Sequence, residues 1–444
     1  MRKGLCRRYL FLAVILGFVG FLVYTVNHAD KVTAMKAKTM DQMADVYPLE
    51  YNSYHQNKVK RDGSTHGHLV LKNRMLAPVD RKYTTLLTNA KGDYAISGME
   101  YNDSIKRWVI SEEKYGAPAV NHEVSGKHIT QGCFACKSSK FNDAYAKEGA
   151  GVFSAELTDD FEENLNAQIL DCAVCHGDVP ENKADARIVY WRMLARDTFD
   201  SFDASERACG QCHNSLGYKP LIKTQEQMDS FSPYRYGIDF DSLILAAIED
   251  GNTKLDKDTG IVFIGLNDHP EIEFTQDSVM HGLGVTCITC HMPMVTDAET
   301  GITYRSHNSS GSPLESEASL NYCLSCHKAQ GLNSPEEMAA MVRELQAKTQ
   351  LEEEELRDKL KLTYNLIKEA NQNGTADEDV LQQDREAYAR AEIYFRGVVG
   401  STDVKAGTNE LADLGVKVSH NPAGTEEYIS AANELLDDII ADLQ

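Results

Sequence analysis

The chain has 444 residues, which is enough for one large core or two domains. Its 67 acidic and 45 basic residues give a net charge of −22. This balance excludes nucleic acid as an expected partner, because nucleic-acid binding requires a basic face. We expect most of the acidic side chains to form a solvated surface.

An 18-residue apolar run from Tyr9 to Val26 follows four basic residues near the N-terminus. It exceeds the ~7–15 residues of a signal-peptide core and matches the ~17–25 residues that span a bilayer. Basic residues before an apolar span predict that the rest of the chain lies outside the cytoplasm. We therefore expect residues 1–30 to form an N-terminal anchor in the bacterial inner membrane. The rest of the protein would then lie on the periplasmic side. A cleaved export signal is the alternative.

Residues 31–130 carry turn signals but no strong periodicity, so we predict irregular structure with short helices. Each histidine of this region is more simply read as a surface residue than as a ligand, but the set supplies candidate metal ligands. Its members are His55, His66, His68, His122 and His128.

Ten of the eleven cysteines form five Cys-x-x-Cys pairs between residues 133 and 327. Lys137 follows the first pair, and a histidine follows each of the others. The pairs are Cys133 and Cys136, Cys172 and Cys175, Cys209 and Cys212, Cys287 and Cys290, and Cys323 and Cys326, and the histidines are His176, His213, His291 and His327.

Cys-x-x-Cys-His is the attachment signature of c-type haem, in which two thiols form thioethers and the imidazole ligates iron. Disulfides are the ordinary use of paired cysteines in exported proteins, but a disulfide needs no histidine after its second cysteine. The separations between pairs also fit no common zinc module. We therefore predict five covalently bound haem c groups in residues 31–330 and a mostly α fold of short helices and loops around them.

Residues 331–444 have a different character. Ser334-Pro335-Glu336-Glu337 predicts a helix start with a capping box. That helix should end at Asn373-Gly374, a second should run from about 377 to 399, and a third from Thr425 to the C-terminus. We expect these long helices to pack on the haem domain and to form a homodimer interface.

The lysine after the first cysteine pair predicts that the haem of this motif has a different role from the other four. A lysine amine must lose its proton to bind iron, which costs about 4.6 kcal/mol at pH 7 from a pKa of ~10.4. Four sites with a proximal histidine need four distal histidines to become saturated electron carriers. The candidates are His281, His307, His420 and one of the N-terminal histidines, which leaves His269 over and the Lys137 iron open for a small molecule.

At this point the chain resembles the ammonia-forming pentahaem cytochrome c nitrite reductases over most of residues 45–444. The resemblance rests on one Cys-x-x-Cys-Lys unit followed by four Cys-x-x-Cys-His units and on several shorter motifs. These are His269-Pro270-Glu271, His281-Gly282, Tyr304-Arg305-Ser306-His307 and His420-Asn421-Pro422.

The resemblance implies a mostly helical homodimer that reduces nitrite, a small anion, to ammonium with six electrons. A quinol-oxidising membrane cytochrome or another donor would supply these electrons. Lys137 would be the proximal ligand of the active haem, and His269 the acid of its distal pocket. By position, the second, fourth and fifth haems would take their distal ligands from His307, His420 and His281, respectively.

The sequence departs from this family at several positions. Asn214, Ser215 and Leu216 stand where the family has Val-Glu-Tyr, whose glutamate binds calcium and whose tyrosine is catalytic, so a calcium site is in doubt. Tyr218 would substitute for that tyrosine if the loop shifts. Lys114 aligns with the active-site arginine, and it keeps the charge but loses the bidentate fork. The family's distal ligand of the third haem is missing, and His122, His128 or His68 would have to serve.

Two hypotheses follow. The first is an enzyme that reduces nitrite, hydroxylamine or a related small oxyanion at the Lys137 haem. The second is a membrane-anchored electron-transfer cytochrome with a vestigial active site. A five-coordinate high-spin haem that responds to nitrite or cyanide indicates the enzyme, and five low-spin six-coordinate haems indicate the electron carrier.

Overall fold

The structure is a computed structural model. It describes residues 43–57, 131–155, 158, 170–177, 184–216, 222, 224–266, 270–309, 311–399 and 414–444, together with the backbone of seven short strands between 59 and 110. Within these parts no helix has both the length and the apolar character required to cross a bilayer. The predicted anchor, residues 1–30, lies outside the described residues.

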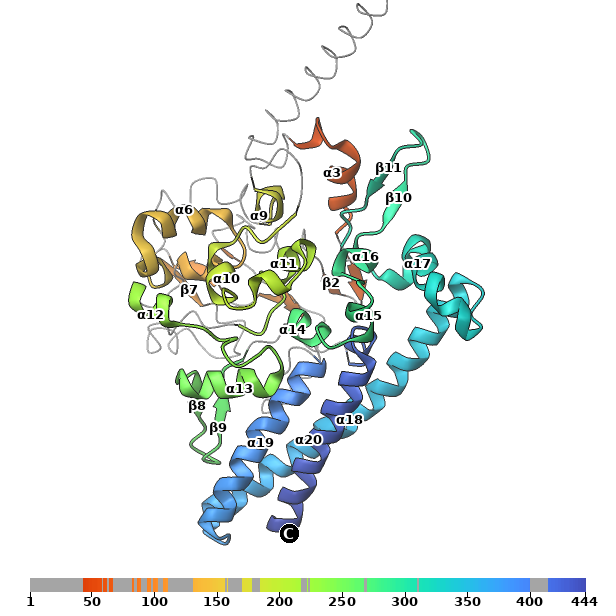
Figure 1. The fold of residues 1–444 in the computed structure, drawn as a ribbon. Helices are drawn as coiled ribbons and strands as arrows, with labels where there is room; N and C mark the ends of the chain where they lie inside the picture. The colour runs from red at the N-terminus through yellow and green to blue at the C-terminus, as the bar shows by residue number, and fades with distance from the viewer. Residues whose placement is uncertain are drawn as a thin grey trace, which may run out of the picture.

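The fold is mostly helical, as predicted, and the helices before the C-terminal region are short (Figure 1). Their bounds are α3 Pro48–Tyr54, α6 Ser139–Glu148, α9 Cys172–His176, α10 Val189–Leu194, α11 Ala204–Gly210, α12 Gln225–Ser230, α13 Phe240–Glu249, α14 Glu271–Thr275, α15 Val279–Gly282, α16 Cys287–His291 and α17 Glu317–His327. Short 3-10 helices lie between them at η3 Gln131–Phe134, η4 Gly149–Phe153, η5 Phe199–Ser201, η6 Pro313–Glu315 and η7 Lys328–Gln330.

The expectation of irregular structure with short helices over residues 31–130 was wrong in part. Besides α3, this region contains β1 Val59–Arg61, β2 Ser64–His66, β3 Lys82–Tyr83, β4 Leu86–Thr88, β5 Tyr94–Ile96, β6 Met99–Asn102 and β7 Arg107–Ile110. They form the antiparallel pairs β1–β2 and β4–β5 and the sheet β3–β6–β7. Strands this short contain too few residues to produce a recognisable alternation of apolar and polar side chains.

Two further antiparallel hairpins lie among the helices that follow. They are β8 Thr253–Leu255 with β9 Val262–Ile264, and β10 Met294–Thr296 with β11 Thr303–Arg305. Figure 1 shows α3 beside the β10–β11 hairpin, although the two are far apart in the sequence. This neighbourhood brings the N-terminal part of the chain to the segment that contains His307.

Three long helices form the C-terminal region: α18 Pro335–Asn373, α19 Glu378–Val399 and α20 Pro422–Leu443. They pack side by side (Figure 1). The first two match the predicted bounds closely. Ser334 accepts a hydrogen bond from the Glu337 backbone N–H, and Gly374 ends α18 in a left-handed conformation at φ 61°. The Glu337 carboxylate accepts a hydrogen bond from the Asn333 N–H. In the predicted capping box it would accept from the N–H of Ser334, one residue later.

The last helix begins earlier than predicted, at Pro422 instead of Thr425. Asn421 is its N-cap, and its Oδ1 accepts a hydrogen bond from the Gly424 N–H at 3.0 Å. Proline is favoured in the first turn of a helix because that turn leaves its backbone N–H groups unbonded anyway. The 3-10 helix η9 Lys417–Ser419 precedes this start and ends directly before His420.

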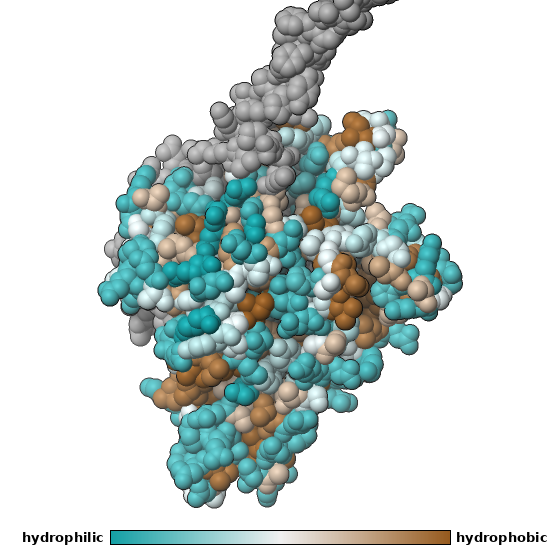
Figure 2. Space-filling view, viewed as in Figure 1, coloured by the Kyte–Doolittle hydropathy of each residue, from teal (hydrophilic) through white to brown (hydrophobic). Residues whose placement is uncertain are grey.

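One buried apolar cluster contains residues of both the motif-bearing segment and the C-terminal helices. Trp191, Tyr190 and Phe153 belong to its first part, and Leu360 and Phe395 belong to the bundle. Figure 2 shows that most of the coloured surface on one face is hydrophilic, with scattered apolar patches. A hydrophilic surface of this kind is well solvated, as the net charge leads one to expect.

Candidate haem sites

The second, fourth and fifth Cys-x-x-Cys motifs lie on short helices with polar caps. The second and fourth motifs are the whole of α9 and α16, and the fifth is the end of α17. Asp171 caps α9 by accepting a hydrogen bond from the Val174 N–H, and Thr286 forms a capping box with Thr289 on α16. A helical turn places both cysteines and the following histidine on neighbouring positions, which is the arrangement a shared porphyrin requires.

His176, at the end of the second motif, faces His307. Their ring centroids lie 6.0 Å apart, and their planes are inclined by 38°. The N-terminal helix fixes His307 on its other side: Ser53 Oγ accepts from the His307 N–H at 2.9 Å, and the Asn57 amide donates to its carbonyl at 2.6 Å. Both of these polar residues are buried. The segment around α3 is therefore part of the second site.

His291, at the end of the fourth motif, faces His420. Here the centroids also lie 6.0 Å apart, and the planes are almost parallel at 10°. Burial lowers the pKa of His291 to about 4, and the neighbouring His420 adds to this effect. Burial lowers the pKa of His420 as well. Both imidazoles are therefore neutral near pH 7 and can offer a ring lone pair to a metal.

These two pairs fit a haem iron with two axial imidazoles. Two imidazoles that bind one metal ion from opposite sides, each through a bond of about 2 Å, place their ring centroids roughly 6 Å apart. None of the nine described cysteine side chains forms a disulfide, so each is available for a thioether. In the described parts of the chain, His176 with His307 and His291 with His420 thus carry the chemistry that a c-type haem needs.

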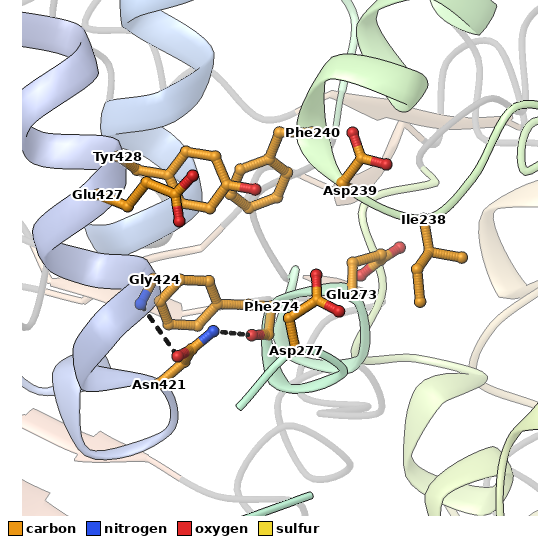
Figure 3. A pocket seen from close by; sticks show the side chains of 10 residues that line it. All are labelled: Ile238, Asp239, Phe240, Glu273, Phe274, Asp277, Asn421, Gly424, Glu427 and Tyr428. Carbon is orange, nitrogen blue, oxygen red and sulfur yellow. Dashed lines mark hydrogen bonds between the residues drawn. The ribbon is translucent and has the colours of Figure 1, made fainter. Parts of the chain in front are cut away.

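The residue after His420 holds this histidine in place. Asn421 Nδ2 donates to the Phe274 carbonyl at 2.9 Å, and Asn421 Oδ1 accepts from the Gly424 N–H (Figure 3). The side chain is 95% buried. It lies beside a small pocket between α13, α14 and α20 and joins α14 to the start of the last helix (Figure 3). The position of His420 is therefore coupled to the segment that follows Pro270.

The third motif contacts three of the other four. Its Gln211 donates to the Val174 carbonyl of the second motif at 2.9 Å and accepts from the Ile188 N–H at 3.0 Å. Cys212 Sγ donates to the Cys136 carbonyl of the first motif at 2.6 Å. The thiols of Cys209 and Cys287 hydrogen-bond to each other, which joins it to the fourth motif. The first, second and fourth motifs therefore meet at the third motif, which we call the junction.

The fifth motif is joined to the fourth. Ser319 on α17 donates to the Cys290 carbonyl at 2.8 Å. His327 Nδ1 lies 2.8 Å from Gln330 Oε1. His281, the expected distal ligand of the fifth haem, has its Nε2 3.2 Å from Glu206 Oε1. The role of His281 remains a prediction.

The histidine that ends the third motif has an acidic neighbour. His213 Nδ1 lies 3.4 Å from Glu271 Oε2. Burial lowers the pKa of His213, but the hydrogen bond and the negative charge of Glu271 outweigh this effect, so the pKa is raised. The sequence shows Glu271 inside the His-Pro-Glu motif, but nothing in its spacing assigns it to the third motif.

The loop after His213 is held by internal hydrogen bonds. Asn214 Oδ1 accepts from the Leu216 N–H, and Glu273 Oε1 accepts from the Ser215 N–H, both at 2.8 Å. The Tyr234 hydroxyl donates to the same oxygen at 2.7 Å. Burial raises the pKa of Glu273 to about 7. Sequence reasoning missed both Glu273 and Gln211, because each acts through contacts with residues distant in the chain.

The other predicted site residues are only partly described. Lys137 is half-buried; its N–H donates to the Phe134 carbonyl at 2.9 Å, and its carbonyl accepts from the Leu170 N–H at 3.0 Å. The other catalytic candidates and the candidate distal ligand of the third haem lie outside the described residues, and nothing is stated of the Cys133 side chain. Those four residues are His269, Lys114, Tyr218 and His122.

The chain is similar to a solved structure of the catalytic subunit of cytochrome c nitrite reductase from Desulfovibrio desulfuricans, which is described with two calcium sites. The TM-score is 0.60 at 18% sequence identity, and the match covers 91% of this chain and 85% of that one. This likeness confirms a multihaem cytochrome fold. The model of the cytochrome c552 family matches residues 39–403. The chain therefore belongs to the cytochrome c552 family, whose haems are covalently bound through motifs such as those described above.

Proposed function

We propose that the protein reduces nitrite, or a related small oxyanion or hydroxylamine, to ammonium at a haem bound by Lys137. Four haems with two histidine ligands each would deliver the electrons. The difference between the motifs supports this division. His176 and His291 each face a second imidazole, whereas the first motif replaces histidine with Lys137 and contacts the third motif through Cys136.

When bound, the haems provide a path for electrons and, at Lys137, an iron that can take a small anion. The protein residues bind, orient and protonate the substrate. Lys137 would ligate the iron through its neutral amine. His269 would donate protons to the substrate oxygen from the distal side, and Lys114 would neutralise the anion. Tyr218 would take the place of the family's catalytic tyrosine.

The contacts between motifs support an order of electron transfer. The fifth motif lies beside the fourth at Ser319 and Cys290, the fourth lies beside the third at Cys287 and Cys209, and the third lies beside the first at Cys212 and Cys136. The second motif joins the third through Gln211. Electrons that enter at the second or fifth haem would therefore reach the Lys137 haem by way of the third.

The test is steady-state turnover by protein loaded with haem in a host that matures c-type cytochromes. The haem content is measured first, and five haems per chain are expected. Reduced viologen then supplies electrons, and ammonium formed from nitrite or hydroxylamine is measured. Fully loaded protein that consumes neither substrate, nor sulfite, contradicts the proposal.

The electron carrier with a vestigial active site is a second candidate, and one observation favours it. Leu216, which the resemblance aligns with the family's catalytic tyrosine, is only 1% exposed and has no hydroxyl. Spectroscopy distinguishes the two candidates. A high-spin haem whose signal shifts with nitrite or cyanide supports the enzyme, and five low-spin haems without such a response support the carrier.

We further propose a periplasmic protein, N-terminally anchored or exported after signal cleavage, that forms a homodimer through its C-terminal helices. A quinol-oxidising membrane cytochrome or another electron donor would reduce it. The family membership and the long helices α18 and α20 support this arrangement. Fractionation of cells and light scattering of the purified protein would test it.

A further inference from the structure

Glu271 links the third motif to the segment that carries His420. Its Oε2 lies 3.4 Å from His213 Nδ1, and its Oε1 forms an ion pair with Lys417 Nζ at 2.7 Å. The Lys417 side chain is only 14% exposed. Lys417 begins η9, and its carbonyl accepts a hydrogen bond from the His420 N–H at 2.9 Å.

The backbone around Glu271 is packed tightly against the third motif. The Ile272 N–H donates to the His213 carbonyl at 3.1 Å. A Cβ added at Gly210 would lie 2.0 Å from Ile272 Cδ1, so the Ile272 side chain packs directly over this glycine. Helix α14 is therefore fixed against the third motif, and the Glu271 carboxylate cannot withdraw from His213 without disturbing that packing.

The charge on this acceptor sets His213 apart from two other predicted iron ligands, His307 and His327. His307 Nδ1 lies 3.0 Å from the Arg305 carbonyl, and His327 Nδ1 lies 2.8 Å from the Gln330 amide oxygen. Both acceptors are neutral. A carboxylate on the second nitrogen of a metal-bound imidazole orients the ring and increases its basicity. An imidazole with more negative charge stabilises the oxidised metal relative to the reduced metal.

We propose that Glu271 and Lys417 together set the reduction potential of the haem whose iron His213 binds. Glu271 lowers this potential through the imidazole, and Lys417 raises it by neutralising the carboxylate. Glu271 is thus a positioning residue that acts through His213. The inference rests on the proposed role of His213 as an iron ligand.

The reduction potential of the third haem affects electron transfer through all five haems. Since the third motif contacts the first, second and fourth, the potential of its haem determines how electrons divide between the entry haems and the Lys137 haem. The Glu271–Lys417 pair therefore sets the reduction potential of the third haem. It leaves the potentials of the second and fifth haems and of the Lys137 haem unaltered.

The test is a spectroelectrochemical titration of the five-haem protein and three variants: Glu271→Gln, Lys417→Met and the double variant. Glu271→Gln should raise the potential of the haem bound by His213 more than that of any other haem, and Lys417→Met should lower the potential of the same haem. We expect each change to alter the oxidised-to-reduced ratio at fixed potential about tenfold, or 59 mV for a one-electron couple. In the double variant, Lys417→Met should have much less effect, because its charge acts through Glu271.

Lys368→Met is the matched control. It removes a lysine from another lysine–carboxylate pair, between Lys368 Nζ and Asp258 Oδ2 at 3.2 Å, which joins α18 to the β8–β9 turn. All five potentials should stay unchanged in this variant. If Glu271→Gln loses a haem, Lys417→Met still decides the outcome by the sign of its shift.

Unchanged potentials in fully loaded Glu271→Gln and Lys417→Met, or shifts of the same sign in both, would overturn the inference. If Lys417→Met shifts the potential as much in the Glu271→Gln protein as in the unaltered protein, Lys417 does not act by neutralising the Glu271 carboxylate. These outcomes are separate from the proposed function. Potentials can be measured in a protein that never reduces nitrite, and nitrite turnover can persist when no potential moves.

Discussion

His291 and His420 face each other with their ring planes 10° apart, although one ends the fourth motif and the other precedes the last helix. If both ligate one iron, His420→Ala should convert a single low-spin haem to a high-spin haem. The haem itself should remain, because its thioethers at Cys287 and Cys290 are intact. Electron paramagnetic resonance and haem content measure the two results. Asn433→Ala on α20 is the control, and a low-spin signal equal to that of the unaltered protein would contradict the pairing.

Lys137→Ala tests the proposed role of Lys137 as the ligand of the active haem. We expect nitrite turnover to fall by more than ~100-fold, because an axial ligand affects the metal at least as strongly as the outer-shell groups that orient it. Most of the haem absorbance should persist. Lys147→Ala is the control: this lysine lies ten residues further along the chain, in α6, and its loss should leave turnover intact. Equal loss of all five haems in Lys137→Ala would show that the lysine has a structural role instead.

Arg207→Lys tests the connection between the second and third motifs. Arg207 forms a two-pronged contact with Asp185, at 2.8 and 3.1 Å, and the Asp185 N–H donates to the Cys175 carbonyl at 3.0 Å. Lysine keeps the charge but cannot make the paired hydrogen bonds. We expect a loss of about 1–3 kcal/mol in the free energy of unfolding. Urea unfolding measures it, and Arg192→Lys, at an arginine that stacks on the same Phe199 ring, should have a smaller effect.

Glu353 predicts a pH dependence of stability. Burial raises its pKa to about 8, although the Gly415 N–H donates to it and favours the charged form. A carboxyl whose pKa is higher in the folded protein than in the unfolded chain binds more protons when folded. Stability should therefore fall as the pH rises from about 4.5 to about 8, by up to a few kcal/mol.

Glu353→Gln should remove this part of the pH dependence, because an amide keeps the same shape without a charge. Urea unfolding between pH 5 and pH 8.5 measures it. Glu355→Gln on the exposed side of α18 is the control. If the unaltered protein and Glu353→Gln show the same slope with pH, the burial of a neutral carboxyl at this position is refuted.

The haem motifs and the C-terminal helices could be predicted from the sequence because both depend on local signals. Cysteine spacing is fixed by the porphyrin, and Ser334 and Gly374 cap α18 through neighbouring atoms. The strands between 59 and 110 were missed because segments of two to four residues have no readable period. The start of α20 was placed late because Asn421 acts as a cap through its own side chain, before the apolar pattern begins.

The contacts between motifs could not be predicted. Gln211 occupies a position of Cys-x-x-Cys that accepts any residue, and only the fold shows that its amide reaches Val174 and Ile188. The resemblance named His-Pro-Glu but gave no role to its glutamate, since the contact with His213 depends on the close approach of α14 at Gly210. Such contacts join residues far apart in the sequence, and a single sequence contains no signal for them.

Helix α3 matters for how the protein can be shortened. Ser53 and Asn57 hydrogen-bond to the backbone N–H and carbonyl of His307, so the stretch that follows the apolar N-terminal run would border the second haem if His307 ligates it. A version without the predicted anchor must therefore be cut before Pro48. A later cut would free His307 from its support while leaving every cysteine in place, and the second haem would be attached but poorly ligated.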